Sequence, residues 1–412
     1  MNANKAAVMF KKILMLALIL WLPVSSADDV SYALINANVF NGVDNTIIAG
    51  ATVLVADGKI EAIVDGGSAV ADRFQVIDLE HNYLLPGLFD VHTHVETLEQ
   101  AERALVSGVT TLRSASTTAY QDVALRELAR AARIPGPDVV AAGVYVTPDL
   151  GNTSLADPRF SEIDGRVDSD DELRLLVNIN ADRGVNVIKT RGTQRAGLPD
   201  TDPRQQVYSE RQLRVVVDAA SRRGLAVMVH AHGDEGARAA VLAGARSIEH
   251  GTYLSAETLA LMKERGTWFV PTYVTMDEMN EEQYDHVLRL RGRHMVPQLE
   301  DAIRTAHALG VRIATGADNY YDNESINRIS VEAEQLVRLG LSNFEALQAA
   351  TVSAAELLEL QAQTGQITPG FEADMILVPA NPLEHIEALQ DVLLVMSNGE
   401  IALQRIPFAV TD

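Results

Sequence analysis

The sequence predicts an α/β protein, a (β/α)8 barrel of the TIM type with a small β domain built from both ends of the chain. Between about residues 84 and 365, short apolar runs alternate eight times with amphipathic segments, as expected for eight β–α units. Residues 28–83 and 366–412 instead contain short β-like stretches separated by turns. The two ends resemble each other and differ from the middle, so we expect them to form one domain.

The β-like stretches of the two ends follow hairpin chemistry. The N-terminal ones are YALINANVF, TVLVADGKIEAIV and FQVIDL, with the turn signals Asn41–Gly42 and Asp57–Gly58 between them. The C-terminal ones are ADMILVPA and VLLVMSNGEIAL. Short strands joined by tight turns predict a β domain rather than further β–α units.

The eight apolar runs of the middle region are the expected barrel strands. Several begin at a glycine that would close the preceding helix. In chain order the runs are YLLPGLFDV, GVTTLRSAS, DVVAAGVYV, GVNVIKTRG, GLAVMVHAH, ARSIEHG, GTWFVPTY and GVRIATGAD. Loops at the carboxyl ends of such strands usually shape the substrate site, and the long, polar, Pro- and Gly-containing loop 193–208 after the fourth run is a candidate.

The first 27 residues have the layout of a secretory signal peptide. Three lysines, Lys5, Lys11 and Lys12, precede the apolar run 13–24, and small residues follow at 25–27. The apolar run is short for a membrane span. We therefore expect cleavage after Ala27, a periplasmic or secreted protein, and no stable membrane anchor after cleavage. An uncleaved signal anchor is the alternative.

Composition excludes several classes of function. The formal net charge of −22 argues against nucleic acid as a partner, because phosphate binding requires clustered Lys and Arg. The chain has no cysteine, which excludes disulfides, cysteine metal ligands and thiol catalysis. No serine-hydrolase elbow, phosphate loop or dinucleotide fingerprint occurs. The oligomeric state is not defined by the sequence, and a homo-oligomer stays open.

Candidate metal ligands gather at the expected carboxyl ends of the barrel strands. His92 and His94 lie one residue apart at the end of the first run, so alternation points both side chains to the same face. The other candidates end the fourth, fifth, sixth and eighth runs, and they are Lys189, His230, His232, His250 and Asp318. Since these strand ends meet in one small ring, the set predicts a site for a divalent metal such as zinc.

Lys189 and His232 each have two interpretations. A lysine in an apolar barrel mouth is costly as a cation. Reaction with CO2 would turn Lys189 into an anionic carbamate that bridges two metals, and an ion pair with Asp318 is the alternative. His232 shares the face of His230, and we interpret His230 as a ligand and His232 as a neighbour of the metals or a substrate contact.

The chain resembles a known family, the amidohydrolase superfamily. The motifs that carry the resemblance cover nearly all of the chain after the signal, and they are LLPGLFDVHTH, VIKTRG, VMVHAHGDEGARAAVLAG, SIEHGTYLS, TGAD, EALQAATVSAAELLEL and GQITPGFEADMILV. The sequence is most similar to the imidazolonepropionase-like branch, which includes zinc Xaa-Pro and Xaa-Arg dipeptidases and ochratoxin-degrading amidohydrolases.

The resemblance implies a binuclear zinc site. One metal would be held by His92, His94 and Asp318, the other by His230 and His250, and carboxylated Lys189 would bridge them. It also implies that the small domain made by both chain ends is β-sandwich-like.

The expected activity is hydrolysis of an amide bond, in a peptide or an N-acyl amino acid, by a hydroxide that bridges the metals. Asp318 would accept the proton of the hydroxide and pass it to the leaving amine, while Lys189 and His250 hold the metals. Tyr253 would donate a hydrogen bond to the oxyanion, with a packed loop tyrosine as the alternative.

The substrate is expected to be a small, dipeptide-like molecule with a free carboxylate. Arg191 and Arg195 suit bidentate capture of that group; pairing of both arginines with Asp200 and Asp202 is the alternative. Two loops depart from the pattern of the dipeptidases. The loop after the fourth run is TRGTQRAGLP where those enzymes are Gly/Ser-rich, and VYVTPDLGNTS replaces their Gly-Gly-His turn, which leaves dipeptidase specificity open.

Three other functions remain as alternatives. A lactonase or esterase would use the same two metals. A mononuclear deaminase-like hydrolase would lack Lys189 and would have a glutamate where this chain has Gly233. A non-catalytic binding protein would be expected to have lost ligands that are all present here. The acidic run 276–286 is interpreted as a solvated helix face, with a lid over the pocket as the alternative.

Overall fold

The structure is a computed structural model that describes residues 30–163, 165–322 and 328–408. The predicted signal peptide lies outside these residues. Within them, no helix is both long enough and apolar enough to cross a bilayer. The strands are β1 (Ser31–Val39), β2 (Ile48–Ala56), β3 (Lys59–Val64), β4 (Phe74–Asp78), β5 (Tyr83–Pro86), β6 (Leu88–Thr93), β7 (Val109–Ser114), β8 (Asp138–Val140), β9 (Val187–Arg191), β10 (Ala226–Ala231), β11 (Ser247–His250), β12 (Trp268–Val270), β13 (Met375–Val378), β14 (Leu394–Ser397) and β15 (Glu400–Gln404).

The helices lie between the strands of the middle region and after them. They are α1 (Leu98–Val106), α2 (Gln121–Arg130), α3 (Asp170–Asp182), α4 (Glu210–Ser221), α5 (Asp234–Ala243), α6 (Ala256–Arg265), α7 (Tyr273–Glu278), α8 (His286–Leu309), α9 (Ile329–Arg338), α10 (Asn343–Ala349) and α11 (Val352–Leu357), with short 3-10 turns at Gly151–Leu155, Pro158–Glu162, Ile386–Gln390 and Ile406–Phe408.

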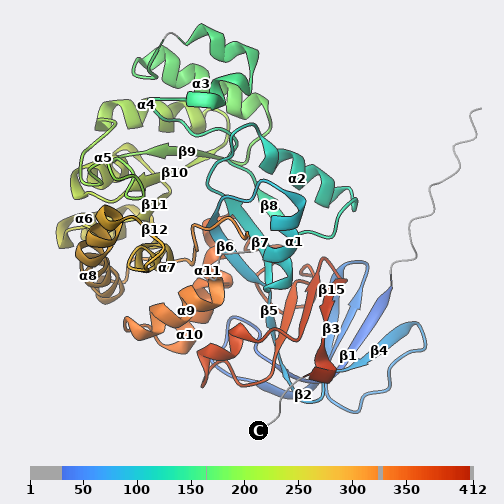
Figure 1. Ribbon diagram of the computed structural model, residues 1–412. Coiled ribbons are helices and arrows are strands. Elements are labelled where there is room, and N and C mark those ends of the chain that lie inside the picture. The colour runs from blue at the N-terminus through green and yellow to red at the C-terminus, as the bar shows by residue number, and fades with distance from the viewer. Residues whose placement is uncertain (1–29, 164, 323–327, 409–412) are drawn as a thin grey trace, which may run out of the picture.

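The two ends of the chain meet in one mixed sheet, as predicted. Its order is β15-β14-β13-β5-β1-β2-β3, with β4 paired to the other part of β1. The blue N-terminal and red C-terminal strands therefore lie side by side in Figure 1. The sandwich-like shape of this sheet stays a prediction.

The middle region forms two parallel sheets, β6-β7-β8 and β9-β10-β11-β12. Isolated parallel bridges continue them at Val146–Thr190, Phe269–Ile313 and Thr93–Asn319. These bridges follow the order expected of a barrel. Residues of β6 and β7 are buried on both faces, which is typical of parallel sheets covered by helices. The α/β class is thereby confirmed.

Helix boundaries agree with the local sequence signals. Capping boxes begin α1, α3, α4 and α10, where a Ser or Thr side chain and a Glu or Gln three residues later satisfy free backbone N–H groups. Gly266 and Gly310 end α6 and α8 with positive φ, a conformation that costs glycine little. The predicted closure of helices by the glycines that open the apolar runs is thus confirmed at these two positions.

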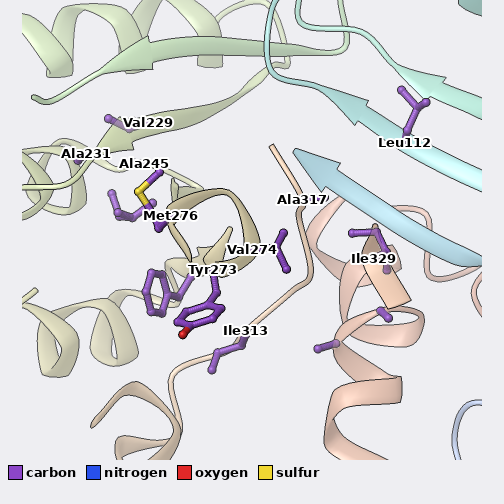
Figure 2. Close-up of a cluster of buried hydrophobic side chains, with 14 of the residues drawn as sticks. Leu112, Val229, Ala231, Ala245, Tyr273, Val274, Met276, Ile313, Ala317 and Ile329 are labelled. Atoms are coloured by element: carbon purple, nitrogen blue, oxygen red, sulfur yellow. The ribbon is translucent and has the colours of Figure 1, made fainter. Parts of the chain in front are cut away.

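The core of the barrel region includes side chains from α7 as well as from the strands. Tyr273, Val274 and Met276 belong to the same buried apolar cluster as Ile313 and Ile329 (Figure 2). This short helix is therefore fixed by apolar packing of these three side chains.

Two predicted strands differ from the observed ones. The first run, YLLPGLFDV, divides at Gly87 into β5, which pairs with β13 in the mixed sheet, and β6, which pairs with β7. The predicted boundary at residue 84 thus falls inside β5. A side chain at Gly87 would collide with Thr110 Oγ1, 2.1 Å from an added Cβ, so the crossing between the two sheets requires glycine here.

The eighth run is not a regular strand. Residues 311–319 contain isolated bridges at Ile313 and Asn319 and further backbone hydrogen bonds to β12 and β6, but no continuous ladder. The buried carboxylate of Asp90 accepts the Ala317 N–H at 3.0 Å and the His92 N–H at 3.1 Å. A side chain thus takes up a backbone donor that a regular ladder would have paired, which is the physical reason for the missing strand.

An acidic cluster beneath the mixed sheet makes stability depend on pH. Asp374 is buried, with Asp138 and Glu372 beside it, and burial together with Asp138 raises its pKa to about 7. A carboxyl whose pKa is higher in the folded than in the unfolded state stabilises the fold at low pH and loses that contribution as pH rises toward 7. We therefore expect Asp374→Asn to be more stable than the parent at pH 8, and the difference to shrink toward pH 5.

The measurement is urea unfolding at both pH values in EDTA, so that bound cations do not contribute. Asparagine suits the site because Asp374 Oδ1 accepts the Asn398 N–H at 2.8 Å and Oδ2 lies 2.6 Å from the Thr364 hydroxyl. The exposed Asp391→Asn serves as the control. An equal stability difference at pH 5 and pH 8 would contradict this origin of the pH dependence.

Candidate metal centre and active site

The predicted ligands converge at the carboxyl ends of the parallel strands. Ligand atoms of His230, His232 and His250 all lie within 4.8 Å of one another, and so do those of His92, His250 and Asp318. His94 Nε2 lies 3.1 Å from Asp318 Oδ1, and Lys189 Nζ lies 3.4 Å from His92 Nε2. All seven residues line one cavity of about 600 Å3.

Each imidazole has one ring nitrogen bound to a protein partner outside the cluster. His94 Nδ1 lies 3.1 Å from Ser116 O, and His230 Nε2 lies 3.1 Å from Gln194 O. A carbonyl only accepts, so both imidazoles donate in these bonds. The Nδ1 atoms of His92, His232 and His250 contact Glu249, Thr252 and Thr272 respectively. Such outer partners orient metal-ligating histidines.

A buried ion pair supports His92. Its Nδ1 lies 2.6 Å from Glu249 Oε2, and Arg113 Nη2 lies 3.0 Å from Glu249 Oε1. Glu249 is fully buried; although burial favours the neutral acid, Arg113 and His92 lower its pKa to about 2. Glu249 is therefore an anion at neutral pH and holds His92 with Nε2 directed toward Asp318, 3.4 Å away.

Glu249 and Arg113 were not predicted. Strict alternation places Glu249 and His250 on opposite faces of β11, but His250 has φ 73°, and this left-handed residue turns both side chains inward. Such conformations cost about 1–3 kcal/mol in non-glycine residues and concentrate at functional sites. Arg113 is, like Lys189, a charged residue inside an apolar run, and this pattern is the signal in the sequence that could have identified it.

We expect Glu249→Gln to weaken metal binding about 10–100-fold, because an outer partner of a ligating histidine is lost. It should also destabilise the fold by about 3–5 kcal/mol, because Arg113 loses its buried counter-charge. Competition with a zinc chelator and urea unfolding measure the two effects. Glu264→Gln, exposed on α6, is the control, and parent-like metal affinity in Glu249→Gln would show that Glu249 does not support His92.

The protonation states of the clustered side chains suit the binding of a cation. Burial lowers the pKa of His232 to about 3 and holds the pKa values of His230 and His250 well below their usual range. These three imidazoles are therefore neutral at pH 7, as metal ligation requires. Asp318 is an anion, because His92 and neighbouring imidazoles keep the pKa of its carboxyl low against the opposing effect of burial.

Lys189 lies within this cluster without a close anionic partner. Its side chain is fully enclosed, and burial lowers the pKa of its amine to about 7. Among the described residues it forms no ion pair within 4 Å with Asp318, so the structure does not realise the alternative in which the two pair.

The predicted arginines lie beside Tyr145. Arg191 and Arg195 place their guanidinium carbons 4.7 and 5.8 Å from the centre of the Tyr145 ring. Arg195 lines the metal cavity and an adjoining cavity of about 590 Å3, whereas Arg191 lines only the second. In the part of the chain that the structure describes, neither pairs with Asp200 or Asp202; Asp202 pairs with Arg204 instead.

Two site predictions require correction. Tyr253 is not on the wall of the metal cavity; it lines a separate hollow of about 160 Å3 beside Gln298 and Asp301. The structure thus places it as a packed loop tyrosine, with its backbone N–H bound to His232 O at 2.8 Å and its ring centre 6.0 Å from that of His294. No oxyanion contact is therefore retained for it.

The second correction concerns the acidic run 276–286. Met276, Glu278, Met279, Gln283 and Tyr284 line the metal cavity, while Glu281 and Glu282 are exposed. The run is thus a wall of the site on one side and a solvated face on the other. Tyr320, which also was not predicted, stacks on His94 with ring centres 5.2 Å apart and lines both cavities.

Comparisons with known proteins define the class. The profile of the amidohydrolase family matches residues 83–402, so the chain belongs to that family and is a hydrolase, as the resemblance implied.

Among curated relatives, it is 27% identical to ochratoxinase of Aspergillus niger over 90% of this chain and 86% of that protein. It is 24% identical to imidazolonepropionase of Pseudoalteromonas atlantica, over 79% of this chain and 85% of the relative.

Solved structures of enzymes are also similar to this one. A Xaa-Pro dipeptidase with bound methionine in its active site superposes with a TM-score of 0.81 at 26% identity, over 90% of this chain and 99% of that one. The A. niger ochratoxinase structure gives 0.77 at 25% identity, over 91% and 96%.

Proposed function

We propose that this chain is a binuclear zinc amidohydrolase on a (β/α)8 barrel, which cleaves an amide bond in a small molecule that carries a free carboxylate. One observation carries the metal dependence. His94 Nδ1 is held by Ser116 O, which leaves Nε2 directed at Asp318 Oδ1, 3.1 Å away in the same cavity. An imidazole nitrogen and a carboxylate oxygen placed this close together are a pair of ligands that one divalent cation can share.

The residues fit two divalent ions. Imidazole nitrogen and carboxylate oxygen suit zinc, and no thiolate ligand is available because the chain lacks cysteine. His92, His94 and Asp318 would hold one ion, and His230 and His250 the other. When bound, two such ions activate a water molecule as the nucleophile and polarise the scissile carbonyl.

Lys189 would complete the site as a carbamate. Its lowered pKa leaves much of the amine neutral near pH 7, and only a neutral amine attacks CO2. The nitrogen forms a bond to the carbon of CO2 and releases one proton, so that a neutral buried amine becomes an anion beside His92. Because the carbamate would supply a ligand for the second ion, it favours a binuclear site over a mononuclear one.

Asp318 is the residue best placed to move a proton. Its carboxylate touches His92 and His94 and faces the cavity, with 18% of its side chain exposed. It would accept the proton of the attacking water and deliver it to the leaving amine. His250, whose Nδ1 is bound to Thr272 Oγ1 at 2.8 Å, would serve beside it as a metal ligand.

Arg191 and Arg195 would bind the substrate carboxylate. The Arg191 Nε is buried and has no hydrogen-bond partner among the described residues, which is costly unless a ligand supplies one. The solved Xaa-Pro dipeptidase relative supports a peptide-like substrate, and the ochratoxinase relative supports a bulkier one. We therefore propose N-acyl amino acids and dipeptides as the substrate class, with His232 as a further contact.

Location and assembly are proposals as well. The lysines and apolar run at the start of the chain support secretion or a periplasmic location without a lasting membrane anchor, and the net charge of −22 argues against nucleic acid as a partner. A homo-oligomer is compatible with this function.

The test is metal content per chain, followed by hydrolysis assays. Two equivalents of zinc in protein prepared with bicarbonate, together with release of a free amine from N-acyl amino acids or dipeptides, would support the proposal. One equivalent would favour the mononuclear site. Turnover of lactones or esters without turnover of any amide would replace amide hydrolysis by the lactonase or esterase function.

A further inference from the structure

One arginine outside the metal site holds the loop after β9. Arg291, on the second turn of α8, makes five hydrogen bonds, and all of them go to residues 196–201. Its Nη1 contacts Ala196 O and lies 2.6 Å from Leu198 O, and its Nη2 lies 2.6 Å from Thr201 O. A guanidinium fork is suited to gathering several carbonyl oxygens at once.

This loop carries the arginine proposed to meet the substrate. Arg195 directly precedes Ala196, the first residue whose carbonyl Arg291 binds. The carbonyl of Arg195 itself accepts the Thr201 hydroxyl at 2.6 Å. Arg195 lines both cavities. The backbone at Arg195 and directly after it is therefore tied to the segment that Arg291 holds, so the position of the Arg195 guanidinium depends on a residue that does not line either cavity.

The same helix also fixes the opposite part of the cavity wall. An added Cβ at Gly292 would lie 2.9 Å from Asn280 Oδ1 and 3.0 Å from Met279 Cβ, so α8 lies in close contact with residues 279–280. Met279 lines the metal cavity. Consecutive residues of α8 thus hold two walls of the site, Arg291 through hydrogen bonds and Gly292 through close approach.

We infer that Arg291 is a positioning residue for specificity: by holding residues 196–201 it places Arg195 for the carboxylate of the substrate. This inference rests on the proposed function, since it assumes that Arg195 binds that carboxylate. Arg291 would leave the metals and the reacting carbonyl untouched. Its loss should therefore weaken recognition of the carboxylate, not the chemistry at the scissile bond.

The first experiment needs no substrate. Hydrogen exchange of the loop amides is compared between the parent and Arg291→Met, with zinc-loaded protein in both cases. Useful probes are the bonds from Gln194 N–H to Gln205 O and from Val207 N–H to Gly192 O. Exchange across 194–207 should accelerate at least about tenfold, because several hydrogen bonds of about 0.5–1.5 kcal/mol each are lost. Arg293→Met, exposed on the same helix, is the matched control.

The second experiment compares a substrate with its carboxamide. For an N-acyl amino acid, Arg291→Met should raise KM about tenfold, the lower end of the loss of a charged hydrogen bond, with kcat within about twofold of the parent. For the same compound with its carboxylate converted to an amide, KM should not change. In an Arg195→Met background, Arg291→Met should add no further loss. Arg291→Lys, with three donors in place of five, should lie between parent and Arg291→Met.

The two arms separate the inference from the proposed function. Unchanged exchange in Arg291→Met would overturn the inference whatever the activity. Faster exchange with an equal loss for acid and amide would also overturn it, since Arg291 would then be structural only. If the parent hydrolyses no amide at all, the proposed function is wrong. The role of Arg291 in placing Arg195 for a carboxylate is then wrong as well, even if hydrogen exchange confirms that Arg291 holds the loop.

Discussion

Lys189→Ala is expected to abolish measurable turnover and to reduce bound zinc to one equivalent or less. The physical reason is that alanine removes the nitrogen on which the proposed carbamate would form, so two cations would share the cavity without that anion between them. A short carboxylic acid such as acetate or propionate fits the space left by the side chain and should restore part of the activity. Elemental analysis and steady-state assays with and without the acid measure these effects.

The control for this prediction is Lys59→Ala, an exposed lysine of β3 in the mixed sheet, which should keep both metals and full turnover. Parent-like activity in Lys189→Ala would exclude the bridging role. Loss of activity with two zinc ions still bound would also contradict it, because the defect would then have another origin than the metals.

Asp318→Asn is expected to lower kcat by about 10^2–10^4-fold, the usual contribution of a general acid–base residue. Asparagine keeps the shape of the side chain and leaves the backbone bond from Asp318 N–H to His92 O, 2.7 Å, in place. Because Asp318 is also a proposed ligand, kcat must be measured at zinc concentrations that saturate the variant, with metal content determined on the same samples.

Asp277→Asn, exposed on α7, is the matched control for Asp318→Asn and should behave as the parent. A metal-loaded Asp318→Asn variant within about tenfold of the parent kcat, outside the range expected for this catalysis, would show that another group moves the proton. Unfolding of the metal-free variant should resemble that of the metal-free parent, which separates a chemical defect from a structural one.

The fold was accessible from the sequence because its signals are local. Apolar runs, capping residues and closing glycines are read a few residues at a time, and parallel strands place their carboxyl ends together. His92, His94 and Lys189 could be found in this way, since each stands where alternation along a strand points it inward.

The remaining parts of the site depend on backbone turns that no short pattern encodes. The left-handed conformation of His250 brings Glu249 into contact with His92, and the sequence predicts neither the turn nor the contact. Tyr253 was misplaced for a related reason: its distance in sequence from His250 is small, but the loop leads away from the cavity. The hydrogen bonds from Arg291 to residues 196–201 join segments about 90 positions apart in the sequence, and only the tertiary structure reveals them.

Segment 311–319 is bonded to both of its neighbours although it is not a regular strand. On one side Phe269 of β12 donates to Arg312 O and accepts from the Ala314 N–H; on the other side the Asp318 N–H donates to His92 O of β6. The carboxylate of Asp90 adds bonds from the Ala317 N–H and the Tyr321 hydroxyl. Loss of the Asp90 carboxylate should therefore loosen the segment that carries Asp318 without detaching it, because its backbone bonds to both strands remain.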